Sequence, residues 1–327
     1  MNIKPQNTLP IHSCTTWLLA CAACLFASVT AFQAAAIEHP TPRYASGEVD
    51  LSDPNYVDVA LVLAVDVSSS IEASERRFQR EAYAEALSDP RVANMALGGS
   101  AGRVAVAYME WSGRNFQRIH LPMRIMSTPE EMAKFAQDIR AVPDDLHDPM
   151  YVQATAIGNA LLAAEHAMAQ LDVRARDYII DISGDGVVND GTSVTTVREH
   201  LVALGLTVNG LPIEVDVELP EYEDIAAEQV SQYYADCVIG GPGSFHVIAR
   251  GFSDVRETLI MKLMLEMAQM PVTQKRLIAS AWNAPTQSAR FIPATALSLD
   301  PQEADSVPRT DCRGADSRGT NAFQIIP

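Results

Sequence analysis

From about residue 55 to residue 270 the sequence alternates between short apolar runs and segments of helical periodicity. The first run, YVDVALVLAVD (residues 56–66), is apolar at almost every position and predicts a strand buried on both faces. Further strands are predicted at residues 103–113, 115–125, 176–183, 206–213 and 244–250. Strands that alternate with helices need crossover connections, which predicts an α/β fold. We expect a doubly wound, mainly parallel six-stranded sheet with helices on both faces and one antiparallel edge strand.

The intervening segments have the apolar spacing of amphipathic helices. In the first of them, Phe78, Ala82 and Ala86 recur on one stripe, which is expected to face the sheet. The next begins with Ser127 or Thr128 as a helix cap, before a proline and two glutamates. Helices are predicted over residues 72–89, 127–142, 155–171, 194–205, 223–237 and 252–269.

The N-terminal segment has the features of a secretory signal peptide. Lys4 is the only charged side chain before Glu38, residues 15–32 are apolar, and small residues end at Ala36. We therefore predict export, to the periplasm or out of the cell, with an uncleaved membrane anchor as the alternative. The predicted organisation is a signal peptide (1–36), a lead-in (37–54), one domain (55–272) and a mostly irregular C-terminal tail (273–327).

The formal net charge of −17 argues against a nucleic-acid partner, which needs a basic face, and against adhesion to an anionic membrane. Three of the five cysteines lie in the signal segment, which leaves Cys237 and Cys312 in the exported chain. In an oxidising compartment these two most simply form one disulfide, and two free thiols are the alternative. The exported chain contains neither a CxxC pair nor a Cys/His cluster, which argues against a structural zinc site.

Oxygen-bearing side chains follow three of the predicted elements at the edge where ligands bind to open α/β sheets. Asp66, Ser68 and Ser70 follow the first strand at alternate positions, Thr155 begins a helix, and Asp185 follows the strand at 176–183. An all-oxygen set suits a hard divalent cation, and two neighbouring carboxylates repel each other without one. Taken singly, the serine run also fits a helix cap and the GDG sequence a turn. Asp181 lies within its strand and is expected to be structural.

In this order and spacing, the D-x-S-x-S, threonine and D-G elements resemble the metal-ion-dependent adhesion site of a von Willebrand factor A domain. The resemblance covers residues 55–270 and extends to a bacterial group of exported, uncharacterised proteins. It implies that the hydroxyls of Ser68, Ser70 and Thr155 bind the cation, with Asp66 and Asp185 acting directly or through water. Mg²⁺ is the expected ion, with Mn²⁺ or Ca²⁺ as alternatives. A Glu or Asp of a protein partner would then occupy an open coordination position.

Two neighbouring segments bear on this site. The approach to Thr155, residues 144–153, is longer and more acidic than the family pattern. We expect its aspartates Asp144, Asp145 and Asp148 to be solvated, with a role in shaping specificity as the alternative. Glu110, Trp111 and Ser112 end the second strand near the same face. Trp111 is read either as an exposed contact for a partner or as a core residue.

Catalytic patterns do not emerge from the sequence. It contains no H-E-x-x-H helix and no G-x-G-x-x-G loop, and its seven histidines are scattered. An aspartyl phosphotransferase would need a carboxylate where Ser68 stands. We therefore expect a non-enzymatic, metal-dependent binding domain. The alternatives are a metal-assisted hydrolase or phosphatase, and a structural domain stabilised by its metal.

Overall fold

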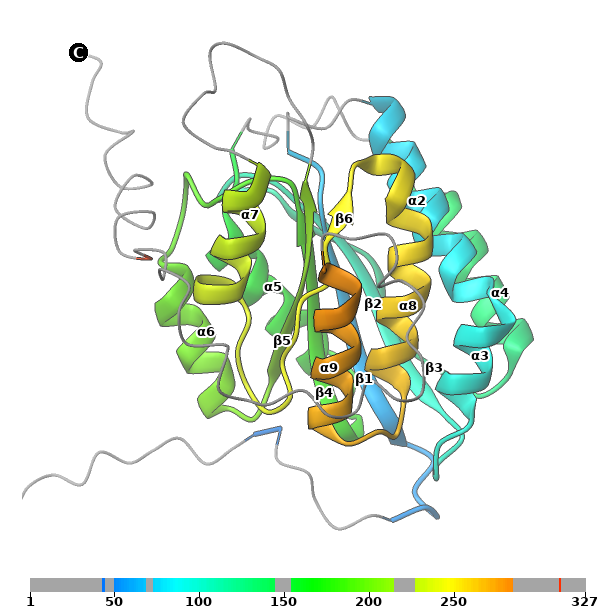
Figure 1. Cartoon of the computed structure of the whole chain (residues 1–327). Helices are drawn as coiled ribbons and strands as arrows, with labels where there is room; N and C mark the ends of the chain where they lie inside the picture. Colours follow the sequence, from blue (N-terminus) through cyan, green and yellow to red (C-terminus); the bar gives the residue numbers. More distant parts are fainter. Residues whose placement is uncertain are drawn as a thin grey trace, which may run out of the picture. The chain divides into compact units, whose positions relative to one another are not determined.

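A single six-stranded sheet organises the domain (Figure 1). The computed structural model describes residues 43–44, 50–68, 73–144, 154–214, 227–284 and 312, and the statements below concern these residues. The strands are β1 (Tyr56–Asp66), β2 (Val104–Trp111), β3 (Gln117–Met126), β4 (Arg174–Gly184), β5 (Thr207–Glu214) and β6 (Ala249–Arg250).

The strand order is β3-β2-β1-β4-β5-β6. Only β3 runs antiparallel to its neighbour, and the other pairs are parallel. This topology confirms the predicted doubly wound sheet with one antiparallel edge strand, which is the architecture of the von Willebrand factor A fold. Its chain reversal lies at β1, the strand between β2 and β4, so the carboxyl end of β1 is where a ligand site is expected.

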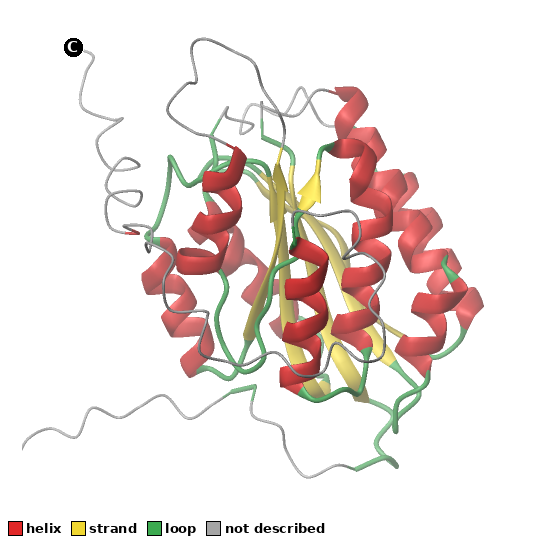
Figure 2. Ribbon diagram, in the orientation of Figure 1, coloured by secondary structure: helices red, strands yellow, loops and turns green. Residues whose placement is uncertain are grey.

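Helices cover both faces of the sheet (Figure 2). On one face lie α5 (Ile157–Ala169), α6 (Val194–Ala203) and α7 (Ala227–Tyr233), which continues as a π-helix (Tyr234–Val238). On the other lie α2 (Ala73–Ser88), α3 (Pro90–Leu97), α4 (Pro129–Arg140) and α8 (Val255–Met267), which follows a 3₁₀ turn (Phe252–Asp254). The last helix is α9 (Val272–Asn283).

The central strand β1 contributes to both cores, which explains its unbroken apolar sequence. All eleven of its residues are buried. Val62 and Ala64 pack in the core under α5, whereas Leu61 and Leu63 pack in the core under α2 and α8. Because burial of one such side chain is worth about 1.5–3 kcal/mol, the position of the whole strand, including its terminal carboxylate, is strongly fixed.

The stripe predicted for α2 is partly wrong. Ala82 and Ala86 are buried as expected, but the Phe78 side chain is 41% exposed. The buried face of α2 is centred on Tyr83 and Leu87, which pack against the sheet. Phe78 therefore falls at the edge of the helix face that contacts the core.

Two differences concern the C-terminal part of the domain. A strand is predicted over residues 244–250, but β6 contains only its last two residues, and His246 forms a single bridge to Gly210. The segment expected to be mostly irregular, 273–327, begins with α9. This helix forms because Ala279 and Trp282, three positions apart, present an apolar stripe that packs with Phe245.

The Cys237–Cys312 disulfide predicted from the sequence is present, with a Cα–Cα distance of 5.6 Å. It joins the π-helix to a residue of the C-terminal tail. The remainder of the tail beyond residue 284 lies outside the described residues, as does the predicted signal peptide, 1–36. No helix in the described part of the chain is long and apolar enough to cross a membrane.

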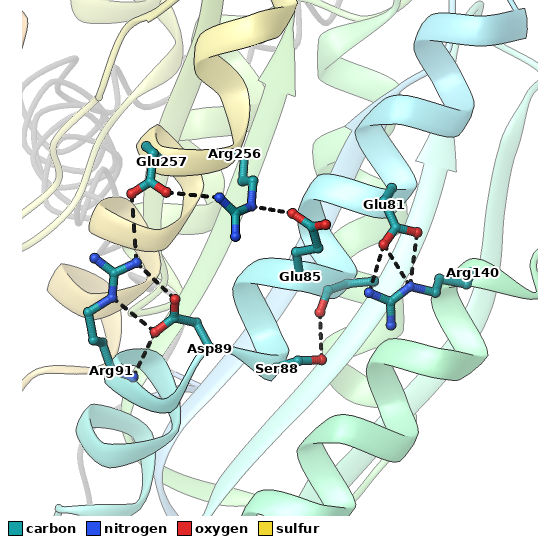
Figure 3. A network of polar contacts seen from close by, with 9 residues as sticks. Glu81, Glu85, Ser88, Asp89, Arg91, Arg140, Arg256 and Glu257 are labelled. Atoms are coloured by element: carbon teal, nitrogen blue, oxygen red, sulfur yellow. Dashed lines mark hydrogen bonds and ion pairs between the residues drawn. The ribbon is translucent and has the colours of Figure 1, made fainter.

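Ion pairs on the molecular surface connect the helices on the α2 side of the sheet (Figure 3). Arg140 of α4 pairs with Glu81 of α2, and Arg256 of α8 pairs with Glu85 of α2. Arg91 of α3 pairs with Glu257 of α8. Exposed pairs of this kind contribute about 0–1 kcal/mol each, so they align the helices more than they stabilise the fold.

A buried ion cluster lies inside the same layer. Lys262 of α8 is fully buried, with Nζ 2.7 Å from Oδ1 of Asp181 and 2.5 Å from Oε1 of Glu266. Asn209 donates a 2.9 Å hydrogen bond to the same Glu266 oxygen. Burial, followed by the charge of Glu266, raises the pKa of Asp181 to about 7, and Lys262 opposes that rise. Asp181 therefore has the structural role expected from its position within a strand.

Replacing Lys262 with Met should lower the free energy of unfolding by about 3–5 kcal/mol, because it leaves two buried carboxylates without a cation. The matched control is Lys134→Met, which removes an exposed pair with Asp138 on α4 and should cost about 1 kcal/mol or less. Urea unfolding of the two variants measures the difference. Equal losses in both variants would contradict a special role for the buried cluster.

Candidate metal centre

The structure brings four of the five predicted ligand residues to the carboxyl edge of the sheet. Asp66 is the last residue of β1, and Ser68 follows two positions later. Asp185 directly follows β4, the parallel neighbour of β1, and Thr155 lies two residues before α5. Ser70, the fifth, lies outside the described residues.

Asp66 is the most constrained of these side chains. It is fully buried, and its Oδ1 accepts a 2.7 Å hydrogen bond from the Ser68 backbone N–H, which turns the chain after β1. Its Oδ2 is also buried and has no hydrogen-bond partner in the part of the chain that the structure describes. Burial, and then the negative charge of Asp185, raise the pKa of Asp66 well above its ordinary value. A nearby cation would relieve both effects.

Thr155 is held against the loop that follows β4. Its backbone N–H donates to Oδ1 of Asn189 at 2.7 Å, and the Asn189 N–H donates to the Thr155 carbonyl at 3.1 Å. A Cβ placed on Gly186 would lie 3.5 Å from Oγ1 of Thr155, so the hydroxyl adjoins the residue after Asp185. Sequence reasoning missed Asn189, whose signal was a polar side chain in the turn-rich loop.

The backbone at the end of β2 holds both the segment that follows β1 and the segment that precedes α5. The Val67 N–H donates to the Trp111 carbonyl, and the Ala156 N–H donates to the Ser112 carbonyl, both at 2.9 Å. Trp111 is fully buried, so it belongs to the core and is not an exposed contact. The Oγ of Ser112 is buried as well and has no hydrogen-bond partner among the described residues.

A second clamp holds the loop after β4. Arg114 donates from its backbone N–H to Oδ2 of Asp190 at 2.9 Å and from Nε to Oδ1 at 2.6 Å. Although burial opposes the change, these bonds lower the pKa of Asp190. On α5, Oδ1 of Asn159 accepts from the Thr192 N–H at 2.8 Å. Neither pairing was predicted, because each joins residues far apart in the sequence.

Glu110 lies close to the site but is already neutralised. Its carboxylate accepts hydrogen bonds from Arg80 Nε (2.6 Å) and Nη2 (2.8 Å) and from the Tyr108 hydroxyl (2.9 Å). The Nε2 of His120 lies 3.2 Å from Oε2. Burial would raise the pKa of Glu110, but Arg80 and His120 together hold it at about 2. Glu110 is therefore a structural anion and not a further cation ligand.

Asp144, the first residue of the acidic segment before Thr155, is not solvated as predicted. Asp144 accepts a 3.2 Å hydrogen bond from Nε of Arg76 on α2, and its side chain is only 26% exposed. This contact ties the beginning of the loop to the helix that follows the serine run. Asp145 and Asp148 lie outside the described residues.

The donor set fits a hard divalent cation. No cluster of three or more His, Cys, Asp or Glu side chains with metal-binding arrangement occurs among the described residues. The described side chains gathered at this edge are the carboxylates of Asp66 and Asp185 and the hydroxyls of Ser68 and Thr155. That combination suits Mg²⁺, Mn²⁺ or Ca²⁺.

Residues 56–271 match the family described as "Protein of unknown function (DUF1194)". The chain belongs to this family. The match covers the whole sheet and both helical layers, and it therefore includes every described residue of the candidate metal centre. No curated protein matches the chain.

Several solved structures are similar to this DUF1194 member. One is proximal thread matrix protein 1 of the mussel byssus with a zinc-occupied MIDAS motif (18% identity, 64% of this chain and 47% of that chain, TM-score 0.43). Another is the pilus adhesin SpaC from Lactobacillus rhamnosus GG (13%, 64% and 30%, 0.44). A third is a von Willebrand factor type A protein from Catenulispora acidiphila (12%, 64% and 43%, 0.42). The chain spans less than half the length of each.

Asp66→Asn should leave the metal-free protein as stable as the wild type or more stable, because it removes a buried charge that Asp185 repels. The same change should abolish stabilisation by added Mg²⁺, since an amide does not neutralise the cation. Thermal unfolding with and without Mg²⁺ measures both effects. The control Asp58→Asn changes a buried carboxylate at the opposite end of β1, where it accepts the Ala101 and Gly102 N–H groups, and should lower stability while preserving the Mg²⁺ effect. An undiminished Mg²⁺ effect in Asp66→Asn would contradict the assignment.

Glu110 predicts a specific acid sensitivity. Its folded-state pKa of about 2 lies below the ordinary 4.5, so it stabilises the fold above pH 4.5. That contribution, about 3 kcal/mol, should be lost as the pH falls from 4.5 toward 2. Urea unfolding across this range should show a smaller decline in Glu110→Gln, which also starts from a lower stability at pH 7. Parallel pH profiles for variant and wild type would contradict this account.

Proposed function

We propose that the protein is an exported, non-enzymatic binding protein that engages an acidic side chain of a protein partner through a divalent cation. The cation would be held by Asp66, Ser68, Ser70, Thr155 and Asp185. The observation that carries the proposal is the buried Asp66 carboxylate, whose Oδ2 lacks a partner in the described structure and which adjoins a second carboxylate.

The residue types assign the roles. The hydroxyls of Ser68, Ser70 and Thr155 are neutral donors, whereas Asp66 and Asp185 together balance the two charges of the cation. The bound ion would supply Lewis acidity for a carboxylate of the partner. Mg²⁺ is the ion we expect, because hydroxyl, carboxylate and water oxygens suit it, and Mn²⁺ or Ca²⁺ could replace it.

The environment of the site supports binding more than catalysis. A hydrolytic mechanism needs a general base within hydrogen-bond reach of the attacking group. Glu110, the acid at the neighbouring strand end, is held by Arg80 and by the Tyr108 hydroxyl. His246 bridges to the middle of β5, and burial together with Lys262 lowers its pKa to about 4. Both groups are engaged in the core.

Export is part of the proposal and has independent support. The Cys237–Cys312 disulfide is expected in an oxidising compartment, such as the periplasm or the extracellular medium. The net charge of −17 suits a soluble partner and not an anionic membrane surface.

The test is capture of partners by the immobilised mature protein from an envelope extract. With Mg²⁺ present a specific partner should be retained, and a chelator should release it. Asp66→Ala should reduce retention about tenfold or more, whereas Asp58→Asn, at the opposite end of β1, should retain the partner in a Mg²⁺-dependent manner. Capture that is indifferent both to chelator and to Asp66→Ala would overturn the proposal. Metal-dependent turnover of a generic phosphoester, lost in Asp66→Ala, would favour the hydrolase alternative.

A further inference from the structure

Tyr234 reaches from the π-helix toward the candidate metal centre. It is fully buried and follows α7, on the face of the sheet that α5 also covers. A Cβ on Gly210 in β5 would lie 2.7 Å from Cδ1 of the Tyr234 ring, and a Cβ on Gly184 in β4 would lie 2.7 Å from its hydroxyl. Two strand glycines therefore provide the space through which the ring passes. Glycine inside a strand commonly marks such a close approach.

The Tyr234 hydroxyl ends beside Asp66. The Cβ position of Gly184 is 2.8 Å from Oδ2 of Asp66, so the hydroxyl and this carboxylate oxygen both lie within 2.8 Å of one point. Both atoms are buried, and neither has a hydrogen-bond partner among the residues that the structure describes. A buried donor and a buried acceptor left unpaired each cost about 1–3 kcal/mol. Their proximity indicates that they act together.

The segment that carries Tyr234 is held from two sides. Arg198 of α6 donates from Nη1 to the carbonyls of Asp236 (3.0 Å) and Cys237 (2.9 Å). Cys237 lies in the same turn as Tyr234 and is bonded to Cys312. π-Helical turns are rare and occur frequently at functional sites. The disulfide therefore fixes the turn from which Tyr234 extends toward Asp66.

We propose that Tyr234 is a positioning residue of the cation site and that the Cys237–Cys312 disulfide holds it there. The inference rests on the proposed cation site. When the cation binds, the hydroxyl donates to Oδ2 of Asp66, directly or through one water, and so orients the carboxylate toward the cation. The oxidised protein accordingly binds the cation more tightly than the reduced protein.

The first experiment measures cation binding to the oxidised mature chain. Calorimetric titration with Mg²⁺ should give a dissociation constant about tenfold weaker for Tyr234→Phe than for the wild type, the usual effect of losing an outer partner of a metal ligand. The matched control is Tyr178→Phe, which loses a hydroxyl bonded to the Val173 carbonyl at the opposite end of β4 and should bind Mg²⁺ normally.

Two further readouts separate positioning from mere structural support. Because its hydroxyl is unpaired, Tyr234→Phe should not destabilise the metal-free protein. Added Mg²⁺ should also produce a tyrosine absorbance difference in the wild type and in Tyr178→Phe, which Tyr234→Phe lacks. The wild-type spectrum remains informative even if the variant folds poorly, and its absence would count against the proposal.

The second experiment compares oxidised and reduced protein. A water-soluble phosphine attacks one sulfur, takes the oxygen of a water molecule to become the phosphine oxide, and leaves two thiols. Reduction should weaken Mg²⁺ binding by the wild type severalfold and change binding by Tyr234→Phe little, because the variant lacks the group that the disulfide positions. Equal sensitivity of both proteins to reduction would overturn the disulfide's role through Tyr234.

The outcomes distinguish this inference from the proposed function. If the wild type binds neither Mg²⁺ nor Mn²⁺, the assignment of the cation site itself is wrong. If the wild type binds Mg²⁺ and oxidised Tyr234→Phe binds it equally well, the site stands and the role of Tyr234 is refuted.

Discussion

A carboxylate buried at the end of the central strand is the constraint on which the rest of the structure depends. β1 is apolar on both faces because it lies between two helical layers, and this packing carries Asp66 to the sheet edge without solvent around it. Ionising a group in such a place is costly unless a compensating charge is near. The negative charge of Asp185 makes that cost larger.

Elsewhere the protein pairs its buried acids with its own donors. Asp181 and Glu266 share Lys262, Glu110 is held by Arg80, and Asp190 is held by Arg114. Asp58 accepts backbone N–H groups of Ala101 and Gly102. Among the described buried carboxylates, Asp66 alone pairs with no Lys or Arg and retains an oxygen without a partner. This contrast within one chain is the strongest physical reason to assign a cation to this edge.

The alternation of strands and helices was sufficient to predict the sheet, because a strand buried on both faces and amphipathic helices leave few topologies. The ligand set could be assembled for the same reason, since parallel strands place their carboxyl ends together. What anchors the site was not predictable. Asn189 holds Thr155, Arg114 holds Asp190, and Tyr234 depends on two glycines, and each contact joins residues that only the folded chain brings together. Two other predictions failed for a related reason. Phe78 was expected to face the sheet, but the local sequence does not fix the rotation of a helix about its axis. Asp144 was expected to be solvated, but the sequence does not reveal that Arg76 lies opposite it in the folded chain.

The most direct test of the cation site is anomalous diffraction from crystals of the mature protein grown with Mn²⁺. We predict one strong peak within coordination distance of the Ser68 and Thr155 hydroxyls, flanked by the carboxylates of Asp66 and Asp185. The peak should be absent from crystals of Asp66→Asn grown in the same way. A wild-type crystal in which this edge of the sheet carries no peak at a Mn²⁺ concentration that saturates ordinary adhesion-type sites, or in which the ion binds elsewhere, would contradict the account.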